Sequence, residues 1–284
     1  APVCACLLYV DDNIAVSDGP DCLTDGTTCT DVTVTFNRTN ADPSRGVSTT
    51  FQRSPELELC GPLGASVTMA TGAGAWLDGY TNTTMQLYDN GGGSYTVDLA
   101  VLGMPCGPTT GGDLFTVSVK RAAGLTGDAT GTVSVTDVTV RDCANAPLPG
   151  VPGAPGEVNI DQTAPAVLAD LVATQVKSGN DTDGTTMIDL SWTAPTGDTD
   201  YVEIWRKGYG DYPEYDDCSG TEPTGPVSTA NGWTLVATVD TADPPAYTDE
   251  PADRDFWYYA AYVVDGCGNV SPVSDITDGT LNYH

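Results

Sequence analysis

Apolar and polar residues alternate with a period of two along several short segments of this chain, and that pattern limits the possible folds most strongly. Successive side chains of an extended strand point to opposite faces, so the alternation predicts strands that each bury one face. Lys and Glu are sparse while Thr, Val, Gly, Asp and Pro dominate, which also favours strands and turns over helices. An all-β protein is expected. The clearest alternating segments are Val32 to Phe36, Tyr95 to Val101 and Phe115 to Val119.

Two local features add detail to this pattern. The glycine-rich segment Asn90 to Gly93 separates two apolar runs and predicts a hairpin turn. Between residues 131 and 142 the apolar positions change from odd to even numbers. A β-bulge near Thr136 and Asp137 would account for that change, because one extra residue in a strand reverses the faces of all later side chains.

A proline-rich segment from Asn145 to Pro165 predicts a domain boundary. Its prolines recur every two or three residues and cannot sustain a helix or a central strand. The 284 residues are enough for two domains that each bury a core. We expect an N-terminal strand, a first β-sandwich, an extended linker and a second β-sandwich, at residues 1–12, 13–145, 146–164 and 165–284.

The second half contains a long apolar run, Asp255 to Val264, followed by a turn at Asp265 to Asn269 and a polar final strand. Together with Ile188 to Trp192 and Tyr201 to Trp205, this order resembles a fibronectin type III domain over about residues 161–284. The resemblance implies an Ig-like sandwich and an extracellular module that binds or builds rather than catalyses.

The first half resembles a bacterial cohesin-like domain over about residues 1–145. The segments that carry the resemblance are Val47 to Cys60, Ser94 to Gly103, Gly111 to Val117 and Gly131 to Asp142. It implies a nine-stranded jelly roll and, as in cellulosome scaffolds, docking of a dockerin-like partner. The order of a cohesin-like and a fibronectin-like domain resembles that of secreted bacterial surface and scaffold proteins.

The charge is strongly acidic, with a formal net value of −29 at pH 7. Residues 1–156 hold 16 acidic and 6 basic residues, and residues 157–284 hold 23 and 4. Nucleic acid requires clustered basic residues and is excluded as a partner, while anionic membrane surfaces are unfavourable. No apolar run is long enough to span a membrane. The acidity fits a soluble secreted protein or one that binds calcium.

The candidate metal site is a calcium loop at Asn180 to Gly184, with Asp181 and Asp183 as ligands. The loop lacks the first aspartate and the distal glutamate of an EF-hand. A solvated acidic surface explains the same residues. Calcium is the first choice if a metal binds, because only oxygen ligands are offered, and no other cofactor is expected.

Nine cysteines indicate an oxidising, extracellular location. No C-x-x-C pair occurs and the only histidine is His284, so structural disulfides explain the cysteines better than a metal or redox site. We expect Cys22 to bond Cys29 and Cys218 to bond Cys267. The other five have no assigned partner, and their odd number leaves one thiol free or bonded to another chain: Cys4, Cys6, Cys60, Cys106 and Cys143.

Two further features fit secretion. The chain begins with Ala-Pro-Val, which is compatible with a signal peptide already removed. Four sequons would accept glycans in a secreted chain, although several are expected by chance where Thr and Ser are common. Their asparagines are Asn37, Asn82, Asn180 and Asn269.

The first ten residues, APVCACLLYV, form a segment that would be apolar on both faces of a strand and would require burial on both sides. Two interpretations stay open. The segment is the first strand of its own domain, or it is a donor strand that completes the sandwich of the next subunit in a head-to-tail contact. The residues of this candidate assembly strand are Val3, Ala5, Leu7, Leu8, Tyr9 and Val10.

Catalytic motifs are not found in the sequence. There is no Gly-x-Ser-x-Gly elbow, phosphate loop or dinucleotide fingerprint, and His284 is poorly placed for a catalytic triad. One aromatic and acidic loop, Gly208 to Asp217, could stack on sugars, contact a protein or pack on itself. We therefore expect a non-catalytic structural protein that self-associates head to tail into an extracellular filament. The alternatives are a carbohydrate-binding or adhesin module and a cohesin-type module that docks a dockerin-like partner.

Overall fold

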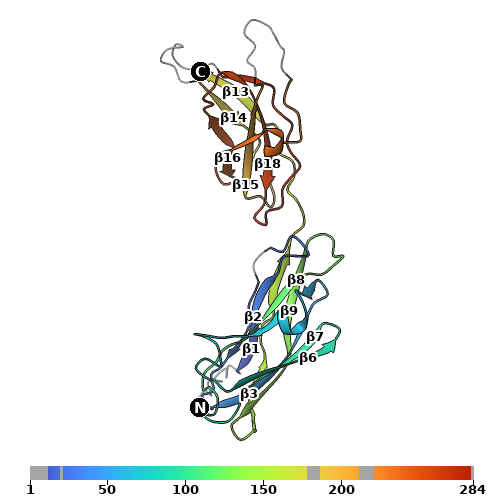
Figure 1. The fold of residues 1–284 in the computed structure, drawn as a ribbon, viewed down its shortest axis with the longest axis vertical. Coiled ribbons are helices and arrows are strands. Elements are labelled where there is room, and N and C mark those ends of the chain that lie inside the picture. Colours follow the sequence, from blue (N-terminus) through green and yellow to red (C-terminus); the bar gives the residue numbers. More distant parts are fainter. Residues whose placement is uncertain (1–11, 20–21, 178–185, 211–220, 283–284) are drawn as a thin grey trace, which may run out of the picture. The chain divides into compact units, whose positions relative to one another are not determined.

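The computed structural model describes residues 12–19, 22–177, 186–210 and 221–282, and the chain divides into two compact units. Unit 1 is Ala1–Gln162 and unit 2 is Thr163–His284 (Figure 1). Regular structure is almost entirely β-strand, which confirms the all-β fold class. The described helices are the single turns α1, Leu63–Ser66, and η1, Thr229–Asn231, and neither has the length or apolar character to cross a membrane.

Unit 1 consists of two β-sheets. In the first, the strand order is β11-β1-β2-β8-β4, and β5 also pairs with β8. Its strands are β1 (Asn13–Val16), β2 (Thr30–Asn37), β4 (Leu57–Leu59), β5 (Val67–Met69), β8 (Gly112–Arg121) and β11 (Val151–Pro152). In the second, the order is β10-β9-β3-β7-β6, and β12 also pairs with β9. Its strands are β3 (Ser44–Arg53), β6 (Thr83–Gly91), β7 (Ser94–Val101), β9 (Ala129–Asp142), β10 (Pro147–Leu148) and β12 (Gly156–Ile160).

A single hydrophobic core lies between these two sheets. The three alternating segments supply β2, β7 and β8, and their apolar residues are buried as predicted. Phe51 of β3 and Phe115 of β8 bring the sheets together, with ring centroids 5.9 Å apart. Burial of the alternating faces is the main source of stability for such a sandwich.

The predicted hairpin and bulge are both confirmed. Gly91 of β6 pairs with Ser94 of β7, so Gly92 and Gly93 form a two-residue turn with positive φ at both positions. In β9, Asp137 pairs with Thr50 while Val135 pairs with the next residue of β3. Thr136 is therefore the extra residue of the bulge.

The segment expected as a linker at residues 146–164 belongs largely to unit 1 in the structure. Its first part forms β10, β11 and β12, which pair with β9, β1 and β9 respectively, and the boundary between the units follows Gln162. Pro147 and Pro152 lie in strands at sheet edges, where the missing N–H removes no ladder hydrogen bond. Val158 and Ile160 alternate with exposed residues in β12 and add to the core of unit 1.

Unit 2 also contains two sheets. One has the order β13-β14-β17, with β13 at Val172–Lys177, β14 at Thr186–Ser191 and β17 at Ala246–Asp249. The other has the order β16-β15-β18-β19, with β15 at Tyr201–Gly208, β16 at Thr234–Asp240, β18 at Asp255–Val264 and β19 at Thr280–Asn282. The resemblance of this unit to fibronectin type III stays a prediction.

Strand β18 is buried on both faces, which explains its continuous apolar sequence. On one face, Tyr259, Ala261 and Val263 enter the core between the sheets. On the other face, Tyr258 and Ala260 enter a second cluster, here called the outer cluster, whose other fully buried members are Val227 and Trp233.

A partly buried ion pair joins the two sheets of unit 2. Arg206 of β15 donates through Nη1 to both carboxylate oxygens of Asp249, at 2.9 and 2.7 Å, and Tyr259 donates its hydroxyl to the same carboxylate at 2.8 Å. Asp249 ends β17, so the contact connects strands of both sheets. Burial, followed by the charge of Asp249, raises the pKa of Tyr259.

The segment after the Asp265 turn was expected to be a polar strand, but regular pairing is limited to the three residues of β19. Before β19, hydroxyl groups replace backbone carbonyls as acceptors. Ser274 donates its N–H to Ala261 O at 2.9 Å, and its Oγ accepts the N–H of Ala261 at 2.9 Å. Ser271 and Thr277 make the same paired contacts with other residues of β18. Serine and threonine therefore hold this irregular segment against β18.

We expect Ser274→Ala to lower the free energy of unfolding by about 1–3 kcal/mol, because the buried N–H of Ala261 would lose its acceptor. Chemical denaturation of the purified variant measures this change. Asp275→Ala, at the exposed neighbouring position, serves as the control and should alter stability little. Equal stability of the two variants would contradict the role of the hydroxyl group.

Candidate functional site

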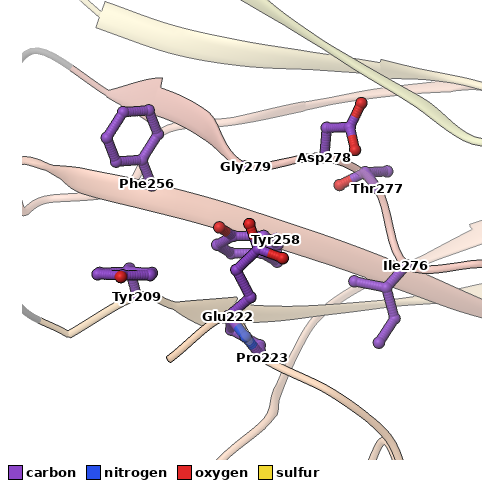
Figure 2. Close-up of a pocket in the computed structure, with 9 residues that line it drawn as sticks. All are labelled: Tyr209, Glu222, Pro223, Phe256, Tyr258, Ile276, Thr277, Asp278 and Gly279. Atoms are coloured by element: carbon purple, nitrogen blue, oxygen red, sulfur yellow. The ribbon is translucent and has the colours of Figure 1, made fainter. Parts of the chain in front are cut away.

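A cavity of about 520 Å³ lies on unit 2, beside the outer cluster (Figure 2). That volume is typical of sites for small ligands. Its walls combine aromatic, aliphatic and acidic side chains. The lining residues are Tyr209, Glu222, Pro223, Phe256, Tyr258, Ile276, Thr277, Asp278 and Gly279.

Strand β18 and its neighbours position the aromatic residues of the cavity. Phe256 and Tyr258 are two positions apart on β18 and therefore point to the same face. Tyr209 follows β15, and its N–H donates to Phe256 O at 2.9 Å. Figure 2 places Tyr258 in the middle of the labelled side chains, with Tyr209 and Phe256 toward one end and Ile276 toward the other. Three aromatic rings thus border one cavity.

The carboxylates make the cavity electrically negative. Burial raises the pKa of Tyr258, and the nearby carboxylates of Glu222, Asp255 and Asp278 raise it further because they disfavour a second negative charge. The phenol therefore stays protonated at neutral pH. Close packing also holds it in place, since a Cβ atom at Gly279 would lie 2.8 Å from both Cζ and Oη of Tyr258.

This arrangement can contact carbon-bound hydrogens with its aromatic faces and can accept hydrogen bonds or attract positive charge with its carboxylates. The described lining residues include two acids and no base.

The aromatic and acidic loop predicted at 208–217 enters the site through Tyr209, while residues 211–217 lie outside the described residues. Sequence reasoning missed Phe256, Tyr258 and Asp278 as site residues, because the first two were assigned only to a core strand.

The candidate assembly strand lies outside the described residues, since these begin at Asp12. The first described strand, β1 at Asn13–Val16, already has β2 on one side and β11 on the other. Asn13–Val16 is therefore the first strand among the described residues of unit 1. The residues predicted for the assembly strand, Val3, Ala5, Leu7, Leu8, Tyr9 and Val10, keep both of their interpretations.

Asp12 anchors the start of the described chain. Its Oδ1 accepts hydrogen bonds from the N–H groups of Thr39 and Asn40, at 2.6 and 3.1 Å, and from the Thr39 hydroxyl at 2.9 Å. Its Oδ2 lies 3.6 Å from Nε of Arg38, and both side chains are almost fully buried. Burial alone would raise the pKa of Asp12, but the hydrogen bonds and the Arg38 charge together hold that pKa below its ordinary value.

The disulfides differ from the expected pairing in one case. Cys29 bonds Cys60, with Cα atoms 5.9 Å apart, so the predicted bond between Cys22 and Cys29 is wrong. Strands β2 and β4 both pair with Val119 of β8 next to these two cysteines, which brings them together. Cys106 bonds Cys143, a pair that the sequence left open.

The remaining cysteines are only partly described. Cys22 and Cys267 are also disulfide-bonded. The predicted partner of Cys267, Cys218, lies outside the described residues, as do Cys4 and Cys6. The Cys218–Cys267 bond and the odd thiol therefore stay predictions.

The structure describes only some of the residues that were predicted to carry glycans or to bind calcium. Asn37 and Asn82 are exposed, whereas Asn269 is half-buried and donates its side-chain amide to Asp265 at 3.0 Å. Among these three, Asn269 is therefore the least suited to carry a glycan. Asn180 and the candidate calcium ligands Asp181 and Asp183 lie outside the described residues.

Comparison with known proteins finds no matching family model and no matching curated protein. Solved cohesin structures are similar to about half of the chain. A cohesin of scaffoldin B from Acetivibrio cellulolyticus, solved with a Cel5 dockerin mutant, is 15% identical over 53% of this chain and 99% of that chain, with a TM-score of 0.41. A non-cellulosomal cohesin from Archaeoglobus fulgidus is 15% identical over 53% of this chain and 91% of that chain, with a TM-score of 0.39.

A third similar structure is the cohesin module of a family 33 glycoside hydrolase from Clostridium perfringens. It is 14% identical over 53% of this chain and 97% of that chain, with a TM-score of 0.41. These identities and TM-scores are too low to assign this chain to a family.

We expect the stability that Asp12 contributes to depend on pH. Because folding lowers its pKa, the contribution is present above the unfolded value of 3.8 and disappears as pH falls through the lower folded value. Asp12→Asn should cost about 1–3 kcal/mol at pH 7, and this difference from the unmodified protein should shrink below about pH 4. Denaturant unfolding between pH 2 and 7 measures it.

The exposed carboxylate of Asp42, in the connection between β2 and β3 that Asp12 contacts, provides the control. Asp42→Asn should leave stability nearly unchanged across the range. A constant difference between Asp12→Asn and the unmodified protein at every pH would refute the assigned ionic role.

Proposed function

We propose that this protein is a non-catalytic binding protein of the cell exterior and that the cavity of unit 2 is its ligand site. The observation that carries this proposal is the cavity itself, in which Tyr209, Phe256 and Tyr258 meet the carboxylates of Glu222 and Asp278. A concave site with aromatic walls and a few polar groups is the usual form of a small-ligand site.

The ionisable groups of the cavity support binding rather than catalysis. The raised pKa of Tyr258 keeps its phenol neutral, so that it can hydrogen-bond a ligand but is a poor base at neutral pH. The disulfides Cys29–Cys60 and Cys106–Cys143 support an extracellular location, because such bonds persist in oxidising compartments.

The test is a ligand screen by two-dimensional NMR on the intact protein, with simple saccharides and small organic ammonium ions at concentrations up to about 10 mM. We expect at least one class to shift the amide resonances of Thr277 and Gly279. Tyr209→Ala should weaken that binding about tenfold through the lost aromatic contact. Tyr88→Ala, at a half-exposed tyrosine of unit 1, is the control and should leave binding unchanged. No shift with any member of the screen would refute the ligand site.

Head-to-tail assembly through residues 1–10 is a second candidate function, favoured by the position of β1. Since Asn13–Val16 already lies between β2 and β11, the doubly apolar segment before it is not required to fill that place in its own sheet. A segment apolar on both faces would still gain from burial in another subunit.

Electron microscopy and light scattering of the oxidised protein test this second candidate. We expect oligomers or filaments from the full chain and monomers from a chain that lacks residues 1–10. A full-length Cys4→Ser and Cys6→Ser variant separates strand insertion, which should survive, from disulfide cross-linking, which should not. Monomers from the full chain under calcium-containing extracellular conditions would exclude assembly.

A further inference from the structure

The cavity of unit 2 carries negative charge that no basic residue of its described lining offsets. Glu222 and Asp278 line it, and Asp255 lies close enough to influence the pKa of Tyr258. Two basic residues of β15 are engaged elsewhere, since Arg206 pairs with Asp249 and Lys207 donates to Asn231 O at 2.6 Å. A positively charged ligand group would therefore meet uncompensated carboxylates.

Unit 2 as a whole also carries a negative net charge. Residues 163–284 contain 21 acidic and 4 basic residues, a formal net charge of −17. A field of this sign attracts cations and raises their concentration near the surface. An anionic ligand would be repelled from the same cavity.

The aromatic residues add a second attraction for cations. The faces of tyrosine and phenylalanine rings attract positive charge through their quadrupole. Unit 2 already contains such a contact, because the guanidinium carbon of Arg206 lies 4.5 Å from the centroid of the Trp257 ring. Tyr209, Phe256 and Tyr258 would offer similar surfaces to the alkyl groups around a ligand nitrogen.

A neutral saccharide fits the lining less well. It can stack on an aromatic ring, but it gains nothing from net charge, and burying the carboxylates against it carries a desolvation cost that no opposite charge offsets. An organic ammonium group fits both the aromatic walls and the negative charge of the cavity. Its carbon atoms contact the rings while its charge faces the carboxylates.

We propose that the cavity binds an organic ammonium group, either of a small quaternary amine or of a lysine side chain. The aromatic walls contact its methyl or methylene groups, and Glu222 and Asp278 supply the opposite charge. This inference rests on the proposed function, namely that the cavity is a ligand site, and adds the chemical class of the ligand.

The test compares choline with 3,3-dimethylbutan-1-ol, a neutral molecule of the same shape, by NMR titration of the intact protein at low salt. We expect choline to bind about tenfold more tightly, because only choline carries the charge. The binding of choline should also weaken as salt is added. N-acetyl-lysine methylamide, titrated in parallel, reports whether a protein side chain is the better source of the ammonium group.

The double variant Glu222→Gln and Asp278→Asn should weaken choline binding about tenfold and leave the neutral analogue unaffected. The matched control is Glu250→Gln with Asp275→Asn, which removes two exposed charges of unit 2 that are not among the lining residues. Circular dichroism of both double variants checks that the fold is retained.

The outcomes separate this inference from the proposed function. If cellobiose shifts the cavity resonances and neither ammonium ligand does, the ammonium proposal is overturned while the ligand site stands. Equal affinity for choline and its neutral analogue also overturns it. If choline, the lysine derivative and cellobiose all leave the resonances of Thr277 and Gly279 unchanged, both proposals fail.

Discussion

Burial of both faces of β18 is the constraint on which unit 2 depends. Tyr259, Ala261 and Val263 require a core on one side, and Tyr258 and Ala260 require a cover on the other. The first need is met by the opposite sheet and the second by Val227, Trp233 and the segment that leads to β19. That segment is held to β18 by serine and threonine hydroxyls, which accept the N–H groups of Tyr259, Ala261 and Val263 in place of backbone carbonyls.

The cavity is a consequence of this double-sided packing. The outer cluster is complete around Ala260, but toward the start of β18 the cover opens, so that Tyr258 and Phe256 line the cavity. There the apolar lining of the cluster meets acidic residues from the flanking loops, among them Glu222 and Asp278. Rigid strands thus present aromatic side chains, and connecting segments supply the charge, which is a common division of roles in binding sites.

Local features of the fold could be predicted from the sequence, and features that depend on distant pairing could not. The turn at Gly92 and Gly93 and the bulge at Thr136 follow from neighbouring residues, and both were predicted correctly. The Cys29–Cys60 bond depends on β2 and β4 meeting the same strand, β8, so the proximity of Cys22 in sequence was misleading. The linker prediction failed for part of its length because prolines are tolerated in edge strands as well as in linkers.

The sequence by itself determined the all-β class, the buried face of each alternating strand, the acidic charge and the wealth of cysteine. These properties follow from residue type and from a period of two, which any extended segment obeys. Tertiary structure alone decided the strand order, the disulfide partners and the meeting of Tyr209, Phe256, Tyr258, Glu222 and Asp278 at one cavity. Strand pairing joins segments that are far apart in the chain, and no local pattern specifies which segments those will be.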